Sequence, residues 1–129
     1  MAKYQRFEEL PVWQEAARLY NAVLDLLEEP NVPLTPGFRN QLDRSALSVS
    51  NNIAEGFERD GSKEFLQFLS QAKGSCGEVR AQLYVAFDQA YLTDSQLHGL
   101  IEKAVEVSRL IAGLMKYLST SDIRGTKYK

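Results

Sequence analysis

The sequence predicts an all-α protein that folds as a single antiparallel up-down-up-down four-helix bundle. Apolar residues recur every three or four positions in four long segments, which is the period of helices that bury one face. No segment alternates apolar and polar residues in the manner of a half-buried strand. The four segments are joined by short connections, and short connections place consecutive helices antiparallel. At 129 residues the chain has the length of one domain, and we expect residues 1–129 to form one.

The first predicted helix covers about residues 10–29. Pro11 suits its first turn, where the missing N–H would have no helical partner in any case. Prolines at positions 30, 33 and 36 make continuation beyond Glu29 unfavourable. The apolar positions that we expect to face the bundle are Trp13, Ala16, Tyr20, Val23 and Leu27.

The other three helices are predicted over about residues 36–58, 62–88 and 94–118. Thr35 and Ser62 are expected to cap the second and third helices, because their hydroxyls accept hydrogen bonds from unpaired N–H groups. Thr93 or Asp94 is expected to cap the fourth helix in the same way. Residues 119–129 have little apolar periodicity and are predicted to form a flexible tail.

The composition is that of a globular protein, with 44% hydrophobic and 25% charged residues. The net charge is −2 and the pI about 5.4, which argue against nucleic-acid binding through an overall positive charge. The charge is also uneven. Residues 1–31 hold three Lys or Arg against six Asp or Glu, whereas residues 93–129 hold six against four.

Cys76 is the only cysteine, which excludes an intrachain disulfide and a metal site built from several cysteines of one chain. We expect Cys76 in the core and the only histidine, His98, on the surface of the fourth helix. The N-terminal residues lack the apolar stretch of a secretory signal, and no 18-residue apolar run occurs. We therefore expect a cytoplasmic protein without a membrane segment or a cofactor.

The first and fourth predicted helices carry more apolar residues than one bundle requires. We interpret the surplus as the interface of a homo-oligomer, because a long apolar stripe is rarely left in water. The alternative is that these side chains fill gaps in a monomeric core. The candidate interface residues are Val12, Leu19, Leu26, Ile101, Leu110, Met115 and Tyr117.

The second predicted helix carries a polar column beside its apolar stripe, with Arg44 or Ser45 one turn before Ser48. The third carries interior glycines, each costing about 1 kcal/mol relative to alanine. We interpret the small residues as a place where the third helix approaches another helix closely. Arg44 would pair with Glu55 or Glu78, since an unpaired buried carboxylate is costly. The alternative is a polar pocket that binds a small ligand or holds a general acid. The network comprises Arg44, Ser48, Asn52, Glu55 and Glu78, beside Gly74, Ser75 and Gly77.

Two short motifs resemble one protein family. Residues Asn52 to Gly56 read Asn-Ile-Ala-Glu-Gly, and Gly74 stands next to Ser75 in the third predicted helix. Over about residues 7–118, the chain is similar to the four-helix-bundle proteins encoded in intervening sequences of bacterial 23S ribosomal RNA genes. The resemblance adds Gly56 to the network and implies a homopentameric ring with a non-enzymatic role.

Proteins of this kind include the accessory variability determinant of diversity-generating retroelements, which binds a reverse transcriptase and nucleic acid through a basic surface. The chain departs from the family in the connection over residues 29–38, which is unusually rich in proline. Its acidic balance also weakens a nucleic-acid role, because affinity for phosphates comes largely from Lys and Arg.

Three hypotheses for function follow. The first is a ring-forming interaction or scaffold protein whose partner is another protein. The second is an RNA- or DNA-binding accessory protein that acts with a ribonucleoprotein or a reverse transcriptase. The third is an enzyme that uses the polar network, although no nucleophile and base pair supports it. The candidate phosphate contacts are Arg59, Lys63, Lys73 and Arg80, with Arg124, Lys127 and Lys129 of the tail.

Overall fold

The computed structural model describes residues 4–121 of the chain. A short 3-10 helix, η1 (Phe7–Glu9), precedes four α-helices. These are α1 (Pro11–Leu27), α2 (Pro36–Glu58), α3 (Ser62–Asp88) and α4 (Asp94–Ser121). No strand occurs in the described residues, so the prediction of an all-α fold with four long helices is confirmed for this part of the chain.

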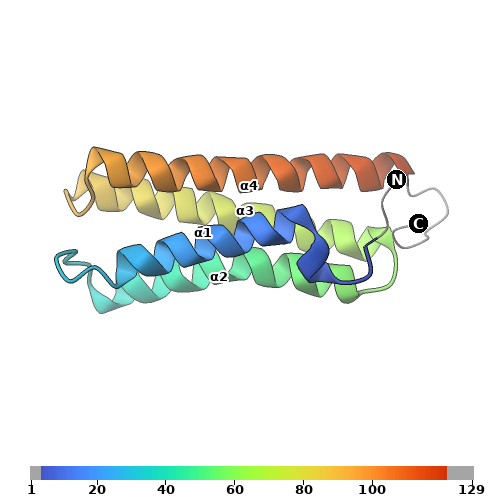
Figure 1. Cartoon of the computed structure of the whole chain (residues 1–129), viewed down its shortest axis with the longest axis horizontal. Helices are drawn as coiled ribbons and strands as arrows, with labels where there is room; N and C mark the ends of the chain where they lie inside the picture. The colour runs from blue at the N-terminus through green and yellow to red at the C-terminus, as the bar shows by residue number, and fades with distance from the viewer. Residues whose placement is uncertain (1–3, 122–129) are drawn as a thin grey trace.

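The four helices lie side by side along the long axis of the molecule, and the connections between them fall alternately at its two ends (Figure 1). Each helix contacts the next one in the chain, and α1 also contacts α4. The four helices therefore enclose a single apolar core. Its largest fully buried side chains are Leu19, Leu42, Ile53, Phe65, Leu69, Leu83 and Ile111.

Side-chain caps begin two of the helices. Thr35 Oγ1 accepts a hydrogen bond of 3.1 Å from the N–H of Phe38. Thr93 Oγ1 accepts from the N–H of Gln96, whose own Oε1 accepts from the N–H of Thr93, at 3.0 and 2.9 Å. This reciprocal arrangement is a capping box, so the predicted roles of Thr35 and Thr93 are confirmed.

The start of α3 differs from the prediction. Gly61, rather than Ser62, is the residue before the first turn, and no side chain caps this end. Gly61 has a φ of 88°, a conformation that favours glycine because it has no Cβ. Ser62 is instead the buried first residue of α3.

The end of α4 also differs, since the helix continues to Ser121 instead of ending near residue 118. The hydroxyls of Ser119 and Thr120 donate back to the carbonyl oxygens of Met115 and Lys116. Residues 119–121 are thus helical, contrary to the predicted tail. Residues 122–129 lie outside the described residues.

The buried face of α1 is only partly the expected one, since Ala16 and Val23 are fully buried as predicted but other positions differ. Val12, Leu19 and Leu26 were expected to face outward, but all three are buried within the chain itself. Together with Ala16 and Val23 they follow a spacing of four and three residues, which centres the stripe on the core. Trp13, Tyr20 and Leu27 are half-buried at its edges and pack against the core from there. Val12, Leu19 and Leu26 therefore do not form an outward-facing apolar column. Of the three, only Leu26, which is 4% exposed, lines a groove, described below.

Tyr20 and Trp13 occupy the flanks of this stripe through specific contacts. The Tyr20 hydroxyl donates a 2.7 Å hydrogen bond to Asp43 Oδ1, which joins α1 to α2. This bond, together with partial burial, raises the pKa of Tyr20. The Trp13 ring packs edge-on against Phe7 of η1, with 5.2 Å between ring centroids.

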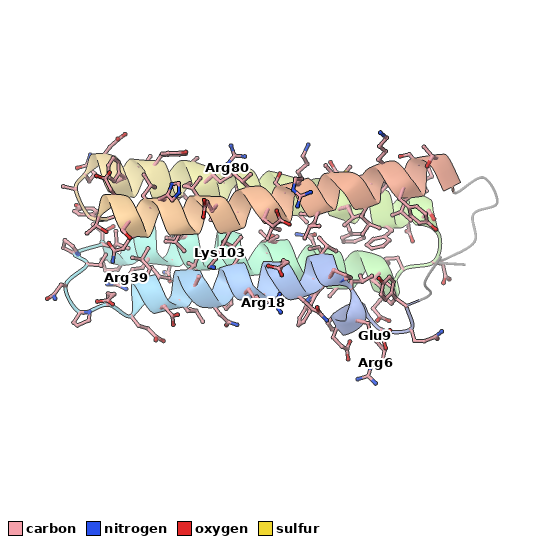
Figure 2. All side chains as sticks on the ribbon, turned by 45° about the horizontal axis from the view of Figure 1, so that its top comes forward. Arg6, Glu9, Arg18, Arg39, Arg80 and Lys103 are labelled. Atoms are coloured by element: carbon pink, nitrogen blue, oxygen red, sulfur yellow. The ribbon has the colours of Figure 1, made fainter. Side chains whose placement is uncertain are left out.

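Arg39 holds the proline-rich connection between α1 and α2. Its guanidinium donates to the carbonyl oxygen of Leu27, the last residue of α1, and to that of Val32 at 3.1 Å. Figure 2 shows Arg39 beside this connection, at the end of the bundle. Carbonyls at a helix C-terminus have no partner within the helix, so a cation there satisfies them and interacts favourably with the helix dipole. Val32 and Leu34 are buried beneath the same connection.

We expect Arg39→Ala to lower the free energy of unfolding by about 1–3 kcal/mol, because two carbonyls lose a charged donor. Arg44→Ala is the matched control, since Arg44 is an exposed arginine of the same helix. Its effect should stay within about 0.5 kcal/mol. Urea denaturation of both variants measures the difference, and equal effects would contradict the role assigned to Arg39.

Candidate functional site

Three of the predicted network residues meet where α2 and α3 pack together. The hydroxyl oxygens of Ser48 and Ser75 are 2.9 Å apart. Asn52 Nδ2 donates to both the carbonyl oxygen and the hydroxyl of Ser48, each at 2.9 Å. All three side chains are half-buried. The contact therefore joins the two helices through neutral hydrogen bonds.

A second polar group lies further along the same helix pair. The Ser45 hydroxyl donates to Glu78 Oε1 at 3.2 Å and accepts from Gln82 Nε2 at 3.3 Å. The Gln82 Oε1 atom is buried and has no hydrogen-bond partner within residues 4–121. Ser45 was the alternative to Arg44 in the polar column of the second predicted helix, whereas Gln82 was not predicted. Their spacing from Ser48 and Glu78, three and four residues, was the available signal.

The charged members of the network do not pair as expected. Within the described part of the chain, no ion pair joins Arg44 to Glu55 or Glu78, and all three side chains are exposed. Glu55 instead pairs with Arg59, one turn later on α2, at 2.9 Å. The expectation rested on burial of the carboxylates. Because water solvates them here, they need no buried cation.

The glycines of the two motifs have different surroundings. A Cβ at Gly56 would lie 2.7 Å from the Phe68 Cβ and 2.8 Å from Phe65 Cδ1, so α2 approaches α3 closely at this point. A Cβ at Gly74 or Gly77 would meet no heavy atom within 4 Å. The predicted close approach at Gly74 and Gly77 is therefore absent within the chain, and the close contact lies at Gly56.

The candidate phosphate contacts are spread along the bundle. Arg59 is engaged by Glu55 and lies over the Phe68 ring, 5.1 Å from its centroid. Lys63 and Lys73 are exposed on α3, and Arg80 is half-buried. Figure 2 shows Arg80 projecting from α3 on the side away from α1. The three tail candidates, Arg124, Lys127 and Lys129, lie outside the described residues.

The Arg80 Nε atom is buried and has no hydrogen-bond partner in the described part of the chain. Nearby, the Cys76 thiol donates to the carbonyl oxygen of Ala104 at 3.1 Å, between α3 and α4. Burial raises the pKa of the Cys76 thiol to about 11, although the positive charge of Arg80 acts in the opposite direction. At neutral pH the thiol is therefore protonated and unreactive. His98 lies on the surface and pairs with Glu102 at 3.1 Å.

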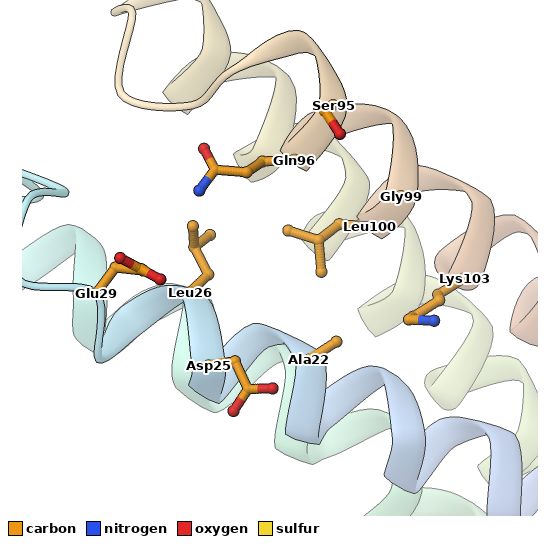
Figure 3. Close-up of a pocket in the computed structure, with 9 residues that line it drawn as sticks. All are labelled: Ala22, Asp25, Leu26, Glu29, Ser95, Gln96, Gly99, Leu100 and Lys103. Carbon is orange, nitrogen blue, oxygen red and sulfur yellow. The ribbon is translucent and has the colours of Figure 1, made fainter.

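A groove of about 270 Å³ lies between α1 and α4, away from the polar network. Leu26 of α1 and Leu100 of α4 point toward each other across it (Figure 3). Glu29 stands at the α1 rim and Lys103 at the α4 rim, with Asp25 on the outer side of α1 (Figure 3). The groove thus combines an apolar floor with charged edges.

A second groove, of about 560 Å³, lies over the contact between α3 and α4. Tyr84, Leu97 and Ile101 are among the residues that line it. Tyr84, which lines this groove, is 48% exposed, and Val105, one turn after Ile101 on α4, is 46% exposed. Val85 of α3 is 51% exposed but does not line the groove. Of the predicted interface residues, Ile101, Leu110, Met115 and Tyr117 are all half-buried against the core, and of these four only Ile101 lines the groove.

Residues 8–113 match the family described as 23S rRNA-intervening sequence protein. The chain belongs to this family. A protein of unknown function from the S23 ribosomal protein family of Bacteroides thetaiotaomicron is similar in structure, with a TM-score of 0.77 and 19% sequence identity. The likeness covers 81% of this chain and 95% of that one, and at this identity it shows the fold alone. No curated protein matches the chain.

The part that matches the 23S rRNA-intervening sequence family contains both motifs of the sequence analysis. The Asn52–Gly56 motif supplies the close contact with α3, and Ser75 of the second motif supplies the hydroxyl that meets Ser48. The motifs by which the chain resembles its family thus join α2 to α3. None of the helices in residues 4–121 is long and apolar enough to cross a membrane.

Two glycine substitutions test this assignment. Gly56→Ala should destabilise the fold by about 1–3 kcal/mol, because the added methyl group collides with Phe65 and Phe68. Gly74→Ala is the matched control in α3, where the methyl group meets open space. It should stabilise the chain by up to about 1 kcal/mol through helix propensity. Thermal and urea unfolding measure the change in stability of each variant. A Gly56→Ala protein more stable than the wild type would contradict the assignment.

Proposed function

We propose that this member of the 23S rRNA-intervening sequence family is a non-enzymatic subunit of a homo-oligomeric ring. The ring acts in the cytoplasm as a scaffold that binds another protein. The subunit is the antiparallel up-down-up-down bundle, and five copies per ring is the number that the family resemblance implies.

The exposed apolar surface on the α3–α4 side carries this proposal. Tyr84 and Val105 stay in contact with water in the isolated chain, although the apolar core is well buried. Burial of apolar surface contributes about 25 cal/mol per Å², so covering these side chains favours association. The surface replaces the α1 column as the proposed interface.

The polar motif residues support a non-enzymatic role. The hydroxyls of Ser48 and Ser75 bond each other, and Asn52 bonds Ser48. Glu55 is neutralised by Arg59 on the surface. These side chains are occupied in joining and solvating the helices, and neither of the two grooves described above includes them.

We expect sedimentation at micromolar concentration to give a mass several times that of the 14.6 kDa chain. Val105→Glu should shift the protein toward monomers, because a carboxylate cannot be buried without a partner. Leu47→Glu is the matched control, since Leu47 is also exposed but lies on α2, which makes no contact with α4 in the described structure. A wild-type monomer, or equal effects of both substitutions, would contradict the proposal.

The alternative is an RNA- or DNA-binding accessory protein. Exposed Lys63 and Lys73 favour it, and a ring would repeat these charges around its axis. The pairing of Arg59 with Glu55 weakens it.

The two functions are separated by fluorescence anisotropy with structured RNA at low and high salt. Under the scaffold proposal we expect no binding, even at about 50 mM salt where phosphate contacts are strongest. Binding that weakens steeply with salt, and that Lys73→Ala/Arg80→Ala abolishes, would favour the nucleic-acid function instead.

A further inference from the structure

We propose that the groove between α1 and α4 binds residues 122–129 of a second copy of this chain. The inference rests on the proposed homo-oligomer and specifies one of its contacts. It follows from the chemistry of the groove, the chemistry of the segment after α4, and the distance between them.

The groove has the features of a peptide-binding site. Its floor is apolar, with Leu26 and Leu100 facing each other, and a Cβ at Gly99 would meet no heavy atom within 4 Å. Its α1 edge is acidic, with Glu29 at the rim and Asp25 on the outer side of α1, and Lys103 lies on the α4 edge. The stretch of α4 from Ser95 to Lys103 is about 12 Å long, which an extended segment of about four residues spans.

The segment after α4 has a complementary composition. Residues 122–129 read Asp-Ile-Arg-Gly-Thr-Lys-Tyr-Lys, with three basic residues and one acidic residue. Arg124 and Lys127 suit the acidic edge that Glu29 and Asp25 give to α1. Ile123, next to Arg124, and Tyr128, next to Lys127, supply apolar side chains at the two ends of this four-residue stretch.

Distance requires that the segment come from another copy. Ser121 lies 21 positions after Leu100 in the same helix, which is about 32 Å along its axis. Eight extended residues reach at most about 29 Å, so the segment cannot lie in the groove of its own chain. Binding therefore joins the end of one subunit to the groove of the next. A contact between two different surfaces of this kind closes into a ring when its rotation permits.

A charge exchange in the full-length protein tests the contact. Glu29→Lys and Lys127→Glu should each weaken association about threefold or more at low salt, and the double variant should recover most of the wild-type affinity. Glu28→Lys is the matched control, because Glu28 is exposed beside Glu29 but lines no part of the groove. Equal effects of Glu28→Lys and Glu29→Lys, or simple addition in the double variant, would overturn the inference.

Disulfide cross-linking provides a second readout. Protein carrying Glu29→Cys is mixed with protein carrying Lys127→Cys and oxidised, while the natural Cys76 stays buried. We expect a mixed disulfide between chains. As the control, Gln14→Cys, near the other end of α1, replaces Glu29→Cys and should give little mixed disulfide. If the wild type is oligomeric but Glu29→Cys cross-links no more than Gln14→Cys, the segment contact is overturned and the ring is not. If the wild type is monomeric, the proposed ring is overturned as well.

Discussion

The structure depends on the removal of one continuous apolar surface from water by four helices. Leu19, Phe65 and Ile111, from three different helices, have no exposed surface at all. Burial on this scale is the main favourable contribution to folding, and it makes an unpaired polar group in the core costly. The serines and asparagine of the family motifs consequently lie at the edge of the core, where they bond each other across the α2–α3 contact.

Much of the fold follows from the spacing of apolar residues and from the residues that begin and end helices. Pro11, Thr35 and Thr93 mark helix starts through local chemistry, so the sequence alone locates them. The inner face of α1 could not be located in the same way, because two apolar columns run along that helix. Which column is central depends on the angle at which α1 meets α2 and α4, and Val12, Leu19 and Leu26 turned out to be the inner one.

The candidate site was less predictable than the fold. Helical spacing placed Ser48, Asn52 and Ser75 near one another, but it could not decide whether Glu55 and Glu78 were buried. Their exposure removed the need for Arg44 as a partner. The hydrogen bonds from Arg39 to the carbonyl oxygens of Leu27 and Val32 were not predicted either. They depend on the path of a proline-rich connection, which has no regular spacing of apolar residues. The grooves involve residues from two helices each, so they required the three-dimensional arrangement.

The close contact at Gly56 determines more than the local spacing of two helices. Two helices that touch at one point can still rotate about that point, whereas two separate points of contact fix their relative orientation. Gly56 against Phe65 and Phe68 is the first point, and the Ser48–Ser75 hydroxyl contact, about 12 Å away along α2, is the second. The two motifs together therefore set the crossing angle of α2 and α3, and with it the shape of the outer surface that these helices present.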